Sequence, residues 1–288
     1  MSRQPRRSIR RRLPGWIATT ILIIGAIGMI APFLWMFSTS MAPATEAFAL
    51  PPRWIPLPLR SDNYLALLDP SQPTGQIPLF QTMFNSAVIA IGVTIGTLIT
   101  CPLAGYAFAR LRFPGREGLF LLLLTSLMVP IQVTIIPLFI IMKNLGLVNT
   151  PWSLILPGLS SAFGVFLMRQ FFLTLPQELL DAASIDGAST FGTFRRIALP
   201  LAKPALSALA IITFLGAWNA YFAPLIMLSD ISNMTMPLAL VAMLGVMKSG
   251  NIAQLMAATT VAIVPVAILF VVAQRWIVAS FARSGVKG

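Results

Sequence analysis

The sequence predicts an all-α integral membrane protein with about six transmembrane helices, because it carries few charges and contains long apolar runs. Of its 288 residues, 57% are hydrophobic and only 10% are charged. A soluble domain carries roughly 25% charged residues, so a chain this poor in charge cannot cover a surface that faces water. The apolar runs do not alternate with polar residues as membrane strands do, and a helix pairs its own backbone groups inside lipid.

The first apolar run, residues 16–38, predicts a retained transmembrane helix and not a cleaved signal peptide. Six arginines in residues 1–15 precede it, as in the charged region of a signal. The apolar region of a signal has about 7–15 residues, whereas this run has about 22 and spans about 33 Å, close to the hydrocarbon thickness.

Five further apolar runs are predicted to cross the membrane. They cover residues 85–108, 118–142, 154–172, 206–228 and 255–278. The chain then divides into a basic segment (1–15), helix 16–38, an external loop (39–81), a five-helix core (82–280) that includes loop 175–206, and a tail (281–288). The external loop is rich in proline, which predicts irregular structure; it is either a surface for an external partner or a connector.

The positive charges predict that both termini lie in the cytoplasm. With the N-terminus inside, six Lys and Arg lie in residues 1–15, three in 109–117, four in 169–203 and three from Arg275 onward, which leaves four of the 20 for the outer loops. The positive-inside rule predicts such a bias. It also explains the net charge of +12 by topology and anionic lipid headgroups, so we expect membrane lipid and no nucleic acid as a partner.

Several kinds of chemistry are missing from the sequence. All eight acidic residues fall outside the predicted spans, so the intramembrane charge of an ion-coupled carrier is lacking. The phosphate-binding pattern G-x-x-x-x-G-K-[ST] is absent as well. With no histidine and one cysteine, an intrachain disulfide, a Cys/His zinc site and histidine catalysis are excluded. If the chain moves a solute uphill, another polypeptide must supply the energy.

Neutral polar and aromatic side chains in or near the spans could contact a polyhydroxylated solute such as a sugar. Helix–helix hydrogen bonding is the alternative use of such groups and the commoner one. The residues assigned to a possible substrate path are Asn85, Gln132, Trp218, Asn219 and Tyr221.

The predicted cytoplasmic loop 175–206 differs from the rest of the chain. Pro176 suits the start of a short helix, in which Leu179, Leu180, Ala182 and Ala183 are expected to form a small apolar face. Gly187 either breaks this helix or allows close backbone approach, and a second helix is expected from residue 188 toward 197. Such a short helix could lie in a groove on another protein, or it could rest on lipid headgroups.

The spacing in this loop resembles the EAA loop of permease subunits from ABC importers. Asp181-Ala182-Ala183, Gly187 and Ile197-x-Leu199-Pro200 match the family pattern E-A-A-x3-G-x9-I-x-L-P, with Asp181 in place of the usual glutamate. Other stretches, among them 112–116 and 285–288, are similar to the carbohydrate importers that include the maltose transporter. The resemblance assigns ATPase coupling to Glu178, Asp181, Ala182, Ala183, Asp186, Gly187, Ile197, Leu199 and Pro200.

This resemblance implies one membrane-spanning permease subunit of a sugar importer in a bacterial or archaeal plasma membrane, and not an enzyme. It implies three partners: a second, related permease, a dimer of cytoplasmic ATP-binding subunits, and an extracytoplasmic solute-binding protein. The chain itself is expected to bind no metal or cofactor, because ATP and magnesium are used by the ATPase. The alternatives are a secondary carrier or facilitator that works alone, and a membrane-embedded enzyme.

Overall fold

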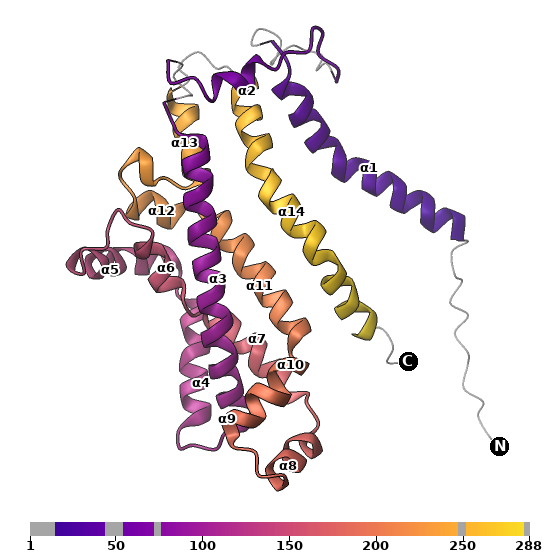
Figure 1. Cartoon of the computed structure of the whole chain (residues 1–288), viewed down its shortest axis with the longest axis vertical. Helices are drawn as coiled ribbons and strands as arrows, with labels where there is room; N and C mark the ends of the chain where they lie inside the picture. The colour runs from indigo at the N-terminus through magenta and orange to yellow at the C-terminus, as the bar shows by residue number, and fades with distance from the viewer. Residues whose placement is uncertain (1–14, 44–53, 72–75, 247–251, 285–288) are drawn as a thin grey trace, which may run out of the picture.

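The computed structural model describes residues 15–43, 54–71, 76–246 and 252–284, and every regular element within these ranges is helical. The arginines of segment 1–15 and the last four residues of the expected tail lie outside the described residues. Figure 1 shows α3 running the length of the molecule, with α2 and α13 near one end and α8 and α9 at the other.

The helices follow one another in this order: α1 (Gly15–Ser40), α2 (Asp62–Ala66), α3 (Leu79–Arg110), α4 (Arg116–Thr125), η1 (Ser126–Met128), α5 (Ile131–Asn144), α6 (Trp152–Gly158), α7 (Ala162–Leu173), α8 (Gln177–Ile185), α9 (Thr190–Thr193), η2 (Phe194–Ala198), α10 (Leu199–Leu201), α11 (Lys203–Trp218), α12 (Phe222–Met227), η3 (Ile231–Asn233), α13 (Met236–Val246) and α14 (Ile252–Ser284). Of these, η2 is a π-helix, and η1 and η3 are short 3-10 turns.

Length and composition allow up to six membrane crossings within the described residues. Four segments qualify as they stand, namely Gly15–Ser40, Leu79–Arg110, Trp152–Leu173 and Ile252–Val272. Two further crossings are bent pairs of helices, at 103° between Arg116–Met128 and Ile131–Asn144 and at 75° between Thr190–Leu201 and Lys203–Trp218. The expected class, an all-α membrane protein with about six spans, is confirmed.

The expected spans 118–142 and 206–228 are each divided into separate helices. The run 118–142 is divided because Val129 is extended and Pro130, which has no N–H to donate, stands before α5. The run 206–228 ends as a continuous helix at Trp218, and α12 begins only at Phe222. The helix that follows η3, α13, was not predicted, because its 11 residues are too few for a span.

A further break separates α6 from α7, and polar side chains of α3 satisfy the carbonyls that it frees. The hydroxyl of Thr97 donates to the Gly158 carbonyl at 3.1 Å, and that of Thr100 donates to the Leu159 carbonyl at 2.6 Å. Ser161 caps α7 by accepting the Gly164 N–H at 2.9 Å. These hydrogen bonds therefore hold the break against α3.

The main buried cluster lies where α3, α7, η2 and α11 meet. It includes Cys101 and Tyr106 of α3, Met168 of α7 and Leu209 of α11. At Gly105, a Cβ atom would lie 2.6 Å from the Met168 Cβ, so α3 and α7 touch backbone to backbone there. A second buried cluster joins α13 and α14 to the N-terminal end of α3, by way of residues such as Met236, Met243 and Ala257.

Candidate functional site

The helix α8 presents most of its side chains to the outside. Leu180 and Ala183 are buried, whereas Asp181 and Ala182 are exposed and Leu179 is 45% exposed. Of the four residues expected to form a small apolar face, Leu180 and Ala183 lie on the buried side of α8 and Leu179 and Ala182 on the exposed side, because a helix turns these two pairs in different directions. The exposed side of α8 therefore carries Asp181 and Ala182 of the motif, where a partner could reach them.

Gly187 ends α8 through its backbone conformation. Its φ of +78° lies in the left-handed region, and the Ala188 N–H returns to the Ala183 carbonyl at 2.9 Å. This is the pairing that closes the C-terminus of many helices, and glycine adopts it without steric cost. A Cβ at Gly187 would meet nothing within 4 Å. The glycine is therefore required by the turn and not by any close contact within this chain.

The second half of the loop is a chain of short helical turns. Ser189 caps α9 by accepting the Gly192 N–H at 3.1 Å. Helical structure then continues through η2 and α10 to Leu201, beyond the expected end near residue 197. The Leu199 N–H bonds to the Phe194 carbonyl in the wider π pattern. Of the motif residues here, Ile197 and Leu199 are half-buried and Pro200 is exposed.

An aromatic cluster fastens this second half to the membrane core. The Phe194 ring lies 5.1 Å from the Tyr106 ring and 6.2 Å from the Phe172 ring, between ring centroids. Tyr106 and Phe172 meet edge to face at 5.4 Å. All three are buried, so η2 is anchored to α3 and α7 by packing whose aromatic pairs contribute about 0.5–1.5 kcal/mol each beyond area burial.

A polar contact fastens the first half of the loop. Arg110, the last residue of α3, donates from its Nε to the Phe172 carbonyl at 3.0 Å and from its Nη1 to the Gln177 Oε1 at 2.8 Å. Gln177 in turn donates from its Nε2 to the Asp181 Oδ1 at 2.9 Å. Sequence reasoning missed Arg110 and Gln177. The sequence signals that could have indicated this contact are the position of Arg110 at the end of a long span and that of Gln177 four residues before Asp181.

The exposed side chains give the loop two charge regions. Glu178, Asp181 and Asp186 are exposed on and just after α8, and Arg195 and Arg196 are exposed on η2. Acidic side chains on one short helix and basic ones on the next suit a polar contact with a protein surface. The alternative, in which α8 rests on lipid headgroups, would need several apolar anchors. Among the described residues of α8, only Leu179 and Ile185 are large, hydrophobic and exposed.

The expected substrate-path residues lie in three places. Asn85, buried in α3, donates to the carbonyls of Ser232 and Met234 at 2.7 and 3.0 Å, which is the helix-packing use of an amide. Gln132 is exposed at the start of α5.

The remaining three, Trp218, Asn219 and Tyr221, surround the break between α11 and α12. The Trp218 ring is buried and stacks on Phe214 at 5.9 Å. Asn219 and Tyr221 are exposed. The Asn219 Nδ2 donates to the Leu215 carbonyl at 2.9 Å, so the groups exposed at this break are the rest of that amide and the Tyr221 phenol.

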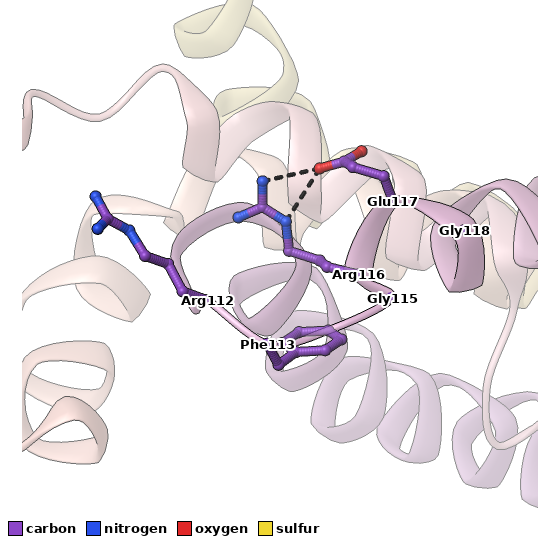
Figure 2. Close-up of a pocket in the computed structure, with 6 residues that line it drawn as sticks. All are labelled: Arg112, Phe113, Gly115, Arg116, Glu117 and Gly118. Atoms are coloured by element: carbon purple, nitrogen blue, oxygen red, sulfur yellow. Dashed lines mark hydrogen bonds and ion pairs between the residues drawn. The ribbon is translucent and has the colours of Figure 1, made fainter.

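A hollow of about 530 Å³ opens at the turn between α3 and α4, and it is lined by Arg112, Phe113, Gly115, Arg116, Glu117 and Gly118. Figure 2 shows Arg116 bonded to Glu117 and Arg112 pointing away from them. Glu117 also pairs with Arg169 of α7 at 3.1 Å, and the Arg169 guanidinium lies over the Phe120 ring at 4.0 Å. The acidic side chain here holds α4 against α7.

Comparison with known proteins identifies similar chains over almost the whole length. Residues 92–283 match the family model described as binding-protein-dependent transport system inner membrane component. The arabinooligosaccharides transport system permease protein AraQ of Halalkalibacterium halodurans is 36% identical over 276 residues, covering 95% of this chain and 96% of that protein. The sn-glycerol-3-phosphate transport system permease protein UgpE of Yersinia enterocolitica is 36% identical over 261 residues, covering 90% and 92%.

A solved structure has the same fold. It is a chain of a bacterial ABC transporter involved in the import of the acidic polysaccharide alginate, and it superposes with a TM-score of 0.75 at 22% identity. The match covers 94% of this chain and 99% of that one.

Proposed function

This chain belongs to the family of binding-protein-dependent transport system inner membrane components, and from that membership we propose that it is one permease subunit of an ATP-driven sugar importer. The family resemblance expected from the loop motif is confirmed, as is the expectation of a transport subunit and not an enzyme. The chain is a multi-pass inner-membrane protein. The proposed solute class is carbohydrate, since one relative is named for arabinooligosaccharides; the other is named for sn-glycerol-3-phosphate, a polyol phosphate ester.

The observation that carries the coupling proposal is the loop from α8 to α10. It lies at one end of the helical core (Figure 1), exposes Asp181 and Ala182, and turns at Gly187 with open space around the turn. In the proposal, α8 docks in a cleft of the cytoplasmic ATP-binding subunit. Asp181 and its acidic neighbours make polar contacts there, and Ala182 and Gly187 allow close approach.

The loop is joined to the membrane core at two points, and the proposed transmission uses both. The aromatic cluster around Phe194 ties η2 to α3 and α7, and Arg110 ties the start of α8 to α3. When ATP binding draws the ATP-binding subunits together, the docked loop is displaced and the helices fastened to it are displaced as well. ATP can shift the permease between two conformations only through contacts that differ between those conformations. In this proposal, the docking surface of α8 supplies these contacts.

The translocation pathway is proposed to form between this chain and a second, related permease, with an external solute-binding protein delivering the sugar. On this side of the pathway, Asn219 and Tyr221 are the proposed solute contacts, because they are exposed at a break between two apolar helices. Gln132 stays a possible contact because it is exposed, whereas the hydrogen bonds of Asn85 favour a packing role.

The proposal is tested by substituting Ala182 with tryptophan. Ala182 is exposed, so Ala182→Trp leaves the packing of this chain unchanged but places an indole in the docking surface. The matched control is Gln170→Trp, at an exposed position of α7 outside the loop. The chain carrying an affinity tag is purified from its own membranes, and the ATP hydrolysis that co-purifies is measured together with sugar uptake by intact cells.

We expect Ala182→Trp to abolish co-purified ATP hydrolysis and uptake, and Gln170→Trp to retain both. A wild-type chain that brings no ATP-hydrolysing subunit with it would contradict the proposal. Uptake by the purified chain alone in liposomes would instead favour the stand-alone carrier.

A further inference from the structure

We propose that Arg110 is a positioning residue that sets the orientation of α8, and with it the carboxylate of Asp181, relative to the end of α3. This inference rests on the proposed function, because it concerns how the docking surface is held ready for the ATP-binding subunit. Neither the loop motif nor its spacing includes Arg110 or Gln177.

The guanidinium of Arg110 joins three segments at once. Its Nε and Nη2 donate to the Phe172 carbonyl at 3.0 and 2.7 Å, at the C-terminal end of α7. Nη2 also donates to the Leu175 carbonyl in the linker, and Nη1 donates to Gln177 at the start of α8. Only arginine offers several N–H groups in a fixed planar fork, and the carbonyls at a helix C-terminus carry partial negative charge that favours a cation.

Gln177 carries this contact on to the motif. Its Oε1 accepts from Arg110, and its Nε2 donates to Asp181, at 2.8 and 2.9 Å. Arginine can only donate and a carboxylate can only accept, so the amide of Gln177 has one permitted orientation. The bonds run in one direction, from Arg110 through Gln177 to Asp181. The carboxylate is therefore held in one rotamer before a partner arrives, which lowers the entropy that docking must overcome.

This contact matters because α8 has little other attachment to the core. Only Leu180 and Ala183 are buried among the α8 side chains that the structure describes, and α8 packs chiefly on the neighbouring α9. The second half of the loop keeps its own anchor through Phe194. Loss of the Arg110 contact would therefore free α8 to change its angle while η2 stays in place.

The experiment uses the complex that co-purifies with the tagged chain, reconstituted in proteoliposomes with its solute-binding protein. Arg110→Lys keeps the charge but replaces the planar fork with a single ammonium. Gln177→Met keeps the length and the helix propensity but can neither accept from Arg110 nor donate to Asp181. The matched controls are Arg112→Lys and Gln170→Met, both at exposed positions outside the loop.

We expect Arg110→Lys and Gln177→Met to lower binding-protein-stimulated ATP hydrolysis and uptake about tenfold, the loss that follows from one or two charge-assisted hydrogen bonds. The yield of the tagged chain from the membrane stays at the wild-type level, which separates positioning from a general loss of structure. Both controls stay within about twofold of wild type.

A second measurement reports directly on α8. A spin label on Ile185→Cys, at a position that is 86% exposed, becomes more mobile when Gln177→Met is added. Wild-type stimulation in both Arg110→Lys and Gln177→Met, with unchanged label mobility, overturns the inference and leaves the proposed function intact. Should Arg110→Lys fail to insert in the membrane, Gln177→Met decides alone, because Gln177 is exposed.

Discussion

Replacement of Gly187 tests why the motif contains a glycine. The residue has a φ of +78°, and a Cβ there would meet nothing within 4 Å. Alanine therefore causes no clash in this chain, but it makes the left-handed conformation about 1–2 kcal/mol less favourable. That cost reduces the population of the observed turn about 5- to 30-fold relative to other conformations. The affinity for the ATP-binding subunit should fall by up to the same factor.

Two further variants distinguish a need for the left-handed backbone at Gly187 from a need for open space around it. Asparagine tolerates the left-handed region, as Asn149 does in this chain at a φ of 64°. Gly187→Asn should therefore bind better than Gly187→Ala if the turn is what matters. Gly115 is the matched control, since it has a φ of +77° and equally open surroundings but lies outside the loop. Gly115→Ala should leave the affinity unchanged.

The assay is a titration of the purified ATP-binding subunit onto the detergent-solubilised chain, with Kd as the readout. A Gly187→Ala chain with the Kd of the wild type would refute the backbone argument. Gly187→Asn binding more weakly than Gly187→Ala would show that the partner needs the space that a glycine leaves.

Two other predictions concern topology and packing. Ile185→Cys should react with a membrane-impermeant maleimide only from the cytoplasmic side and Ile231→Cys only from outside, with no background from the single cysteine, which is buried; labelling of both from one side would contradict the orientation. Gly105→Ala should lower the stability of the purified chain by about 1–3 kcal/mol, because its Cβ would lie 2.6 Å from that of Met168. The control Gly216→Ala, whose Cβ meets nothing within 4 Å, should leave the thermal unfolding temperature unchanged or slightly raised.

The membrane class and the position of the loop could be predicted because both depend on local sequence. Long apolar runs directly indicate segments that cross the bilayer, and the motif from Asp181 to Pro200 has fixed spacing. The divisions of the spans were harder to predict. Proline occurs inside α3 and α14 without dividing them, at Pro102 and Pro265, whereas Pro130 stands at a bend of 103°. Which proline bends the chain depends on the packing around it.

The candidate site was predicted as a motif and not as an arrangement in space. The link from Arg110 to Gln177 crosses 67 positions of sequence, so no local pattern indicates it. Which residues of α8 are buried also depends on non-local packing. Composition marks Leu179 and Leu180 as equally apolar, but in the folded chain Leu180 is buried and Leu179 is exposed.

The break between α6 and α7 limits where this molecule can flex. Two carbonyls at the break accept from the hydroxyls of Thr97 and Thr100, so a change of conformation there would lose bonds inside an apolar medium, where no water can replace them. The two helices and α3 must consequently travel as one piece. In the proposed transport cycle, alternation of the gate is then expected at the two measured bends, of 103° at 129–130 and of 75° at residue 202, and a cross-link that freezes either joint should halt transport without loosening the rest of the fold.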